Sequence, residues 1–136
     1  MSAIGSGLSI GQVAERTGLT AHTLRFYERE GIIVNPVRRG PGGRRIYSED
    51  DVEWLNLLTI LRATGMPVTA IRRYTDLVRA GDGNEHERLA LLRGHQEHVT
   101  AQLAQLTERL DLIRFKVGVY EDIIAEVDGA EQEAPA

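Results

Sequence analysis

The strongest constraint on the fold is a periodic apolar pattern in the C-terminal part of the chain. Between Leu89 and Val127, positions separated alternately by three and four residues are apolar in eleven of twelve cases, and only Gln96 is polar. A 3.5-residue period of this length indicates a coiled coil. One helix over these 39 residues would be about 58 Å long, too long for the rest of the chain to cover its seam. The sequence therefore predicts a homodimer with these residues at its interface: Leu89, Leu92, Val99, Leu103, Leu106, Leu110, Ile113 and Val117.

Glycines and acidic residues set the expected limits of this helix. The segment from Ala80 to Asn84 contains two glycines and marks a domain boundary. Gly118 is the weak point of this helix, because glycine inside a helix costs roughly 1 kcal/mol relative to alanine, and the sequence leaves open whether the helix is continuous there. The expected domains are a head over residues 1–81, a dimerisation helix over residues 82–127 and an acidic flexible tail over residues 128–136.

Charge is distributed unevenly between the two parts. Residues 1–80 hold 11 Arg against 8 Asp and Glu, net +3, whereas residues 81–136 hold 5 basic and 12 acidic residues, net −7. Fifteen of the sixteen basic residues are arginines, whose planar guanidinium can form paired hydrogen bonds with phosphate or guanine. This split predicts a head that faces nucleic acid, joined to a part with another task.

The composition excludes several classes of protein. The absence of cysteine rules out disulfides, thiolate metal sites, Fe–S clusters and a cysteine nucleophile. No apolar run approaches the 18 residues of a membrane span, and the N-terminal residues do not resemble a secretory signal. We therefore expect a soluble cytoplasmic protein without membrane contact.

The head reads as a series of short helices around a small hairpin. Ser9 with Gln12 and Ser48 with Asp51 fit capping boxes, and Thr20 can cap a further helix. The expected helices cover residues 10–17, 21–30 and about 49–64, with a fourth beginning at Pro67. Between residues 33 and 47, two very short strands flank a Gly/Pro tip. The fold class is mainly α: a winged helix-turn-helix head with a small β-hairpin wing, followed by a long dimerisation helix.

Polar residues of the second helix and the wing are candidates for DNA contact. The major groove admits a helix, and this helix offers His22, Thr23 and Arg25, of which Arg25 can bind either guanine or phosphate. Tyr27 can donate to a phosphate, or it can belong to the core together with Tyr47. The wing arginines, which no core could hold, can follow the backbone or a minor groove: Arg38, Arg39, Arg44 and Arg45.

The order of these motifs resembles the MerR family of bacterial transcription regulators over about residues 8–80. The resemblance lies in Ser9-Ile10-Gly11-Gln12-Val13-Ala14, Thr23-Leu24-Arg25-Phe26-Tyr27-Glu28, Gly31-Ile32 and Arg45-Ile46-Tyr47-Ser48-Glu49-Asp50-Asp51-Val52. It implies DNA contacts by Arg25, Tyr27, Arg45 and Tyr47, and a second wing with Arg62, Arg72 and Arg73.

Membership in that family would also imply a mechanism. The homodimer, an antiparallel coiled coil in the family, would sit on a pseudo-palindromic operator in double-stranded promoter DNA. It would bend and untwist the duplex so that RNA polymerase can read both promoter elements. A small-molecule effector would bias two states of the dimer.

Further segments resemble a branch of the family associated with aldehyde and thiol stress and with alcohol dehydrogenase genes. They are residues 51–55, residues 61–67 and Lys116-Val117-Gly118-Val119-Tyr120. That branch senses through a cysteine one residue before Leu61, where this chain has Ile60, so its thiol chemistry is unavailable here. Trp54, Ile60 and Tyr120 could instead line a small apolar effector cavity, and Lys116 could form an imine. The simpler interpretation of Trp54 is packing between the head and the next helix.

Other functions have less support in the sequence. His95 and His98 lie on one helical face, but nothing completes a set of ligands, so we expect no metal and no cofactor. We also expect no enzyme, because the chain contains no nucleophile–base pair or P-loop. The alternatives are a repressor or architectural DNA-binding protein without an effector, and a coiled-coil adaptor whose head binds protein.

Overall fold

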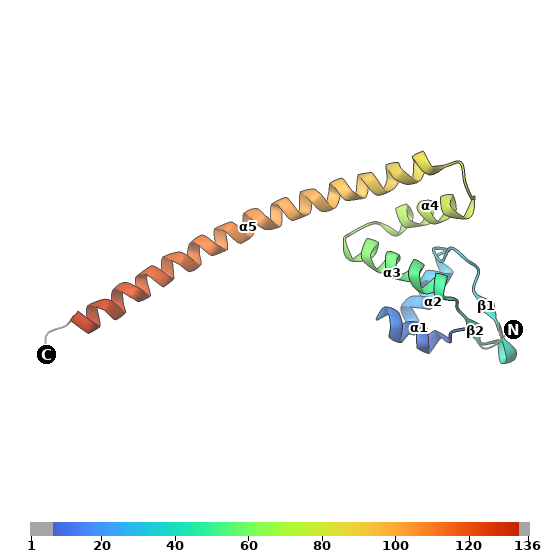
Figure 1. The fold of residues 1–136 in the computed structure, drawn as a ribbon, viewed down its shortest axis with the longest axis horizontal. Coiled ribbons are helices and arrows are strands. Elements are labelled where there is room, and N and C mark those ends of the chain that lie inside the picture. The colour runs from blue at the N-terminus through green and yellow to red at the C-terminus, as the bar shows by residue number, and fades with distance from the viewer. Residues whose placement is uncertain (1–6, 134–136) are drawn as a thin grey trace. The chain divides into compact units, whose positions relative to one another are not determined.

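The computed structural model describes residues 7–133, and it is mainly helical as predicted (Figure 1). The chain divides into two compact units, the first ending at His95 and the second beginning at Gln96. The elements, in chain order, are α1 (Ile10–Thr17), α2 (Ala21–Arg29), β1 (Arg38–Arg39), a 3-10 turn (Pro41–Gly43), β2 (Arg45–Ile46), α3 (Glu49–Ala63), α4 (Val68–Arg79) and α5 (Glu85–Glu133). No described helix combines the length and apolarity that crossing a membrane requires.

The helix-turn-helix of α1 and α2 begins and ends at the predicted signals. The Ser9 hydroxyl accepts a hydrogen bond from the Gln12 amide at 3.1 Å, and the Gln12 side chain returns one to the Ser9 amide at 2.8 Å. Gly18 ends α1 with φ of 75°, in the left-handed region that favours glycine. The Thr20 hydroxyl then caps α2 by accepting from the Thr23 amide at 3.0 Å.

The wing comprises residues 38–46, in which β1 pairs antiparallel with β2. Arg38 is opposite Ile46 and Arg39 is opposite Arg45. Gly42 and Gly43 form the tip with φ of 76° each, which explains why two glycines stand there. The end of the wing is tied to the chain before α1, because Leu8 and Tyr47 exchange two backbone hydrogen bonds of 2.8 Å.

One apolar core holds the head together. α1 packs against α2 and α3, and α3 packs against α4. Val13, Leu24, Leu55, Leu58 and Ile71 are all fully buried and come from four helices. α3 presents its core residues at the spacing expected of an amphipathic helix, behind the Ser48–Asp51 capping box that the sequence predicts.

Three features of helix α5 bear on the limits that the sequence suggests for it. It continues through Gly118 without a break, because one glycine's cost is small against a helix of 49 residues. It also continues to Glu133, so residues 128–133 are helix rather than a separate tail, and residues 134–136 lie outside the described chain. The first compact unit reaches His95 rather than residue 81, because Leu92 packs against the head core.

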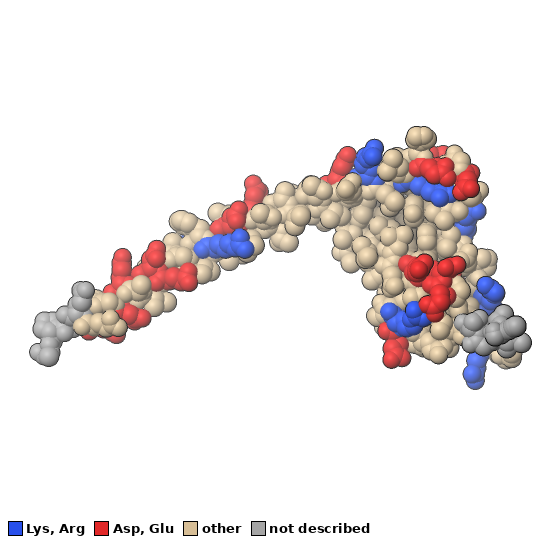
Figure 2. Space-filling view, in the orientation of Figure 1, with Lys and Arg blue, Asp and Glu red and all other residues tan. Residues whose placement is uncertain are grey.

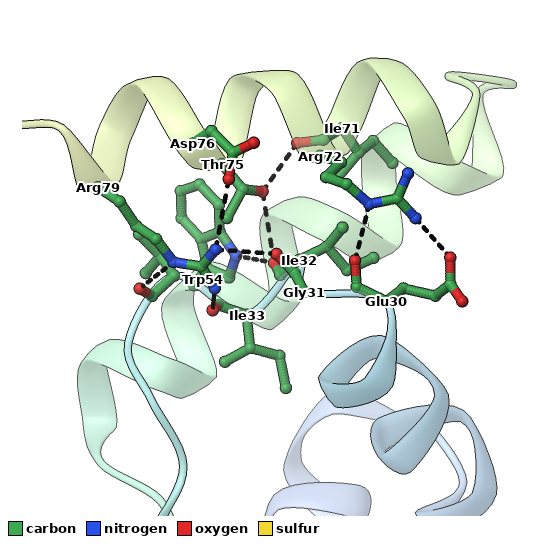
Figure 3. Close-up of polar contacts among 11 residues, drawn as sticks. Glu30, Gly31, Ile32, Ile33, Trp54, Ile71, Arg72, Thr75, Asp76 and Arg79 are labelled. Atoms are coloured by element: carbon green, nitrogen blue, oxygen red, sulfur yellow. Dashed lines mark hydrogen bonds and ion pairs between the residues drawn. The ribbon is translucent and has the colours of Figure 1, made fainter.

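Five consecutive carbonyl oxygens, those of Glu30 to Val34, accept hydrogen bonds from side chains of α3 and α4 (Figure 3). Arg79 supplies three of them, to Gly31 at 3.1 Å, to Val34 at 3.0 Å and to Ile33. Arg72 donates to the Glu30 carbonyl at 2.9 Å, and the Trp54 indole donates to Ile32 at 2.7 Å. These bonds fix the segment that leads from α2 towards the wing, in place of a regular backbone partner.

We predict that Arg79→Ala lowers the free energy of unfolding by about 2 kcal/mol, because one charged group satisfies several carbonyls there. Arg79→Lys should lie in between, since one ammonium cannot reproduce the planar fork of donors. Urea denaturation measures both. Arg93→Ala is the control, because Arg93 is exposed on α5 and makes no hydrogen bond or ion pair within residues 7–133. Equal stability of Arg79→Ala and wild type would contradict the assigned role.

Candidate nucleic-acid interface

One face of α2 is open and basic. Leu24 and Tyr27 point into the core, whereas His22, Arg25 and Arg29 are exposed at three- and four-residue spacing on one side. Arg25 and Arg29 make no hydrogen bond or ion pair in the described chain. Arg29 was missed by the sequence analysis, although its spacing from His22 and Arg25 was a sufficient signal. Thr23 is half-buried and shares a 3.0 Å hydrogen bond with the Thr20 hydroxyl.

The four wing arginines divide by what they contact. Arg38 and Arg44 are exposed and have no partner among residues 7–133. Arg39 donates to the Gly43 carbonyl at 2.9 Å, across the wing tip. Arg45 is half-buried and binds the Glu28 carboxylate at 2.6 Å, which ties the wing to α2. Arg38 and Arg44 therefore have all their donors available for a ligand.

The two tyrosines predicted to contact DNA belong to the core. Tyr27 is 6% exposed and Tyr47 is 1% exposed. The Tyr47 hydroxyl is buried without a hydrogen-bond partner. Burial raises the pKa of this hydroxyl, and the nearby Glu28 carboxylate raises it further, while Arg45 and Arg25 act in the opposite direction. Their burial favours the packing role that the sequence had left open for both tyrosines, and a phosphate contact by either one stays a prediction.

The arginines expected in a second wing make internal contacts. Arg62 donates to the Met66 carbonyl at 2.8 Å, and Arg73 pairs with Glu87 at 3.1 Å while both stay exposed. Arg72 binds both the backbone and the carboxylate of Glu30, as Figure 3 shows. Contacts of Arg62, Arg72 and Arg73 with DNA stay predictions.

The three residues proposed for an effector cavity have different environments. Trp54 stacks on Tyr74 at a centroid distance of 5.7 Å, with the rings 2° from parallel. Together with its bond to Ile32, this stacking supports the packing interpretation of Trp54. Ile60 is 61% exposed on α3, and Tyr120 is 58% exposed on α5 in the second unit. An effector site at these residues stays a prediction.

Within the second unit, α5 presents the predicted seam to solvent. Leu103, Leu106 and Ile113 are each at least 60% exposed, and Leu110 and Val117 are also exposed. Leu89 is exposed on the part of α5 in the first unit, Val99 is half-buried, and Leu92 packs on the head core. Leu92 is therefore corrected from a seam residue to one that supports its own head.

Charged side chains are distributed unevenly between the head and α5. Figure 2 shows basic side chains at the wing end of the head and acidic side chains gathered along the C-terminal part of α5. On the head, the ion pair between Arg16 and Glu49 lowers the pKa of the Glu49 carboxyl, mainly because Arg16 donates a hydrogen bond to it.

The histidines that the sequence suggested as possible metal ligands include His95, which contacts the Thr64 hydroxyl at 2.7 Å. No group of three or more His, Asp or Glu that could hold a metal occurs in the described part of the chain.

Comparison with known proteins agrees with this architecture. Residues 8–77 match the family described as MerR HTH family regulatory protein, and residues 52–114 match the MerR DNA-binding family. An uncharacterised HTH-type transcriptional regulator of Haemophilus influenzae is 38% identical, over 81% of each chain. The HTH-type transcriptional regulator AdhR of Bacillus subtilis is 38% identical, over 68% of this chain and 65% of its own.

Solved structures give the same result. The crystal structure of HiNmlR, a MerR family regulator lacking the sensor domain and bound to promoter DNA, matches with a TM-score of 0.77 and 36% identity, over 88% of this chain and 94% of that one. A MerR family regulator of Listeria monocytogenes matches with a TM-score of 0.84 and 27% identity, over 93% and 95% of the two chains. The protein belongs to the MerR family of helix-turn-helix transcriptional regulators.

Proposed function

We propose that this regulator binds promoter DNA as a homodimer, with α2 in the major groove and the wing on the phosphate backbone. The observation that carries the proposal is the exposed face of α2 with His22, Arg25 and Arg29, beside a wing whose Arg38 and Arg44 are unpaired. Guanidinium groups without internal partners are suited to phosphates and guanine edges. HiNmlR, which shares this fold, is bound to promoter DNA.

The dimer follows from α5. Its seam residues from Leu103 to Val117 are exposed in the single chain, and a contiguous apolar stripe of this length marks an interaction surface. A second copy offers an identical stripe, so two α5 helices would cover each other. Two heads held by one coiled coil fit a pseudo-palindromic operator, because half-sites repeat the symmetry of the dimer.

Regulation would work through the shape of the DNA. A dimer that contacts two half-sites can hold the duplex bent and untwisted between them, and thereby change how RNA polymerase reads the promoter. Such a regulator acts on the chromosome, and the proposal therefore includes a cytoplasmic location. It needs no catalytic group, and a small-molecule effector would act by favouring one of two dimer states.

The first prediction concerns the seam. Leu103→Asp combined with Leu110→Asp should give monomers and abolish operator binding, because two carboxylates in each chain would be buried between helices. Sedimentation velocity and gel shift measure the two effects. The control combines Ala101→Asp with Gln105→Asp, which adds the same side chains on the opposite side of α5 and should leave a dimer. A seam variant that still sediments as a dimer would contradict the coiled-coil assignment.

The second prediction separates arginines that bind phosphate from those that support the head. Arg38→Ala should weaken binding to all DNA sequences alike and flatten the slope of log affinity against log salt by about one unit. Arg72→Ala should keep that slope but reduce thermal stability, because Arg72 is bound to Glu30. A flatter slope for Arg72→Ala would instead make Arg72 a phosphate contact.

The third prediction concerns sensing. Because the 136 residues include no cysteine, operator affinity should be unchanged by N-ethylmaleimide and by diamide. Fluorescence anisotropy with a labelled operator measures the affinity, and mass spectrometry confirms that the protein is unmodified. A reagent-dependent change in affinity at unaltered protein mass would contradict this expectation.

A further inference from the structure

A side chain of α3 contacts the last residue of α5 that belongs to the first compact unit. Nε2 of His95 lies 2.7 Å from the hydroxyl oxygen of Thr64, in a half-buried position. Thr64 is the C-terminal cap of α3, and its backbone amide donates to the Ile60 carbonyl at 3.0 Å. One turn earlier in α5, Leu92 packs against the head core. One apolar and one polar contact therefore fasten the first turns of α5 to the head.

The Thr64 hydroxyl determines which atom carries the proton in its contact with His95. This hydroxyl has a single hydrogen, which it donates to the Ile60 carbonyl at 2.8 Å, with the Leu61 carbonyl as a second acceptor at 3.2 Å. Only its lone pairs are left for His95, so Nε2 of the imidazole is the donor. The hydrogen bond thus requires one tautomer of His95 and one orientation of the Thr64 hydroxyl.

The position of His95 along α5 gives this hydrogen bond its importance. Polar contacts also hold the start of the same helix, because Arg88 donates to the Asn84 side chain at 2.6 Å and Glu87 pairs with Arg73 at 3.1 Å. His95 lies about two turns further along, and from Gln96 onward α5 continues without a break into the second unit. His95 therefore holds the end of the segment that joins the head to the dimer helix.

We propose that His95 is a positioning residue, whose hydrogen bond with Thr64 locks the base of α5 to α3 and thereby makes the dimer selective for the spacing of its two half-sites. The inference rests on the proposed function, in which two heads joined by α5 bind two half-sites. Firmly held heads present their α2 helices at one separation, whereas loosely held heads adapt to several. Firm attachment also raises the effective concentration of the second head at its half-site.

The first experiment tests this lock in the full-length protein without DNA. Amide hydrogen exchange over residues 85–95 should become about tenfold faster in His95→Ala and in Thr64→Val, because either change removes the hydrogen bond. The double variant should differ little from either single variant, since the same interaction is lost. His95→Gln and Thr64→Ser should restore slow exchange, because Gln supplies an N–H donor and Ser keeps the hydroxyl. Exchange rates unchanged in His95→Ala would overturn the lock.

The second experiment measures selectivity for spacing. A symmetric operator bound by the wild type is compared with duplexes that have one base pair inserted or removed between the half-sites, which turns one half-site by about 35° relative to the other. His95→Ala and Thr64→Val should bind the original operator about tenfold more weakly and discriminate less between the three spacings. A duplex with one half-site should be bound equally by all variants, and His95→Gln should recover the wild-type preference.

Glu97→Gln is the control, because Glu97 is exposed on α5 and makes no hydrogen bond or ion pair within residues 7–133. It should keep the wild-type preference for spacing, and sedimentation velocity should show that every variant is a dimer. If the wild type binds promoter DNA and His95→Ala discriminates between spacings as well as the wild type does, the positioning role of His95 is overturned. If the wild type binds no promoter DNA, the proposed function fails, and the exchange experiment still decides whether His95 fastens α5 to α3.

Discussion

The placement of α2 and the wing depends on a stretch of backbone with no regular partner. Between α2 and the wing, the carbonyls of Glu30 to Val34 lie outside helix and sheet, and side chains of α3 and α4 satisfy them. Buried or half-buried carbonyls without partners would be costly, so these bonds specify one path for the chain. Because that path leads from the recognition helix towards the wing, α3 and α4 act as the frame on which both are mounted.

Arginine has two different roles in the head: some arginines bind its backbone carbonyls, and others leave their guanidinium groups exposed. The guanidinium groups of Arg72 and Arg79 donate hydrogen bonds to backbone carbonyls of the head, and Arg72 also binds the Glu30 carboxylate. Arg25, Arg29, Arg38 and Arg44 form no side-chain hydrogen bond or ion pair within residues 7–133. The arginines of the head therefore do not all form one binding surface. Arg72 and Arg79 of α4 stabilise the backbone before the wing, whereas the exposed arginines of α2 and the wing face solvent. Arg45 stands between these groups, because Glu28 orients it while leaving its terminal donors available.

The long helix α5 exposes an apolar surface that needs a partner. The first turns of α5 pack against the head through Leu92, and beyond His95 the seam residues from Leu103 to Val117 are exposed. Its helical state persists through Gly118, which indicates that the pattern over the whole helix outweighs one unfavourable residue. A second copy supplies the missing surface, and a dimer in turn provides two heads for two half-sites.

The sequence by itself determined the order of elements, because caps, glycines and apolar spacing act over a few residues. The Ser9 and Ser48 capping boxes, the Gly18 turn, the hairpin of residues 38–46 and the 3.5-residue seam of α5 are all local signals, and the family motif rests on them. Only the tertiary structure decided what each polar side chain does. Tyr47 proved to be core, Arg72 a support for Glu30, and Arg29 part of the open α2 face, since burial and pairing depend on residues distant in the chain.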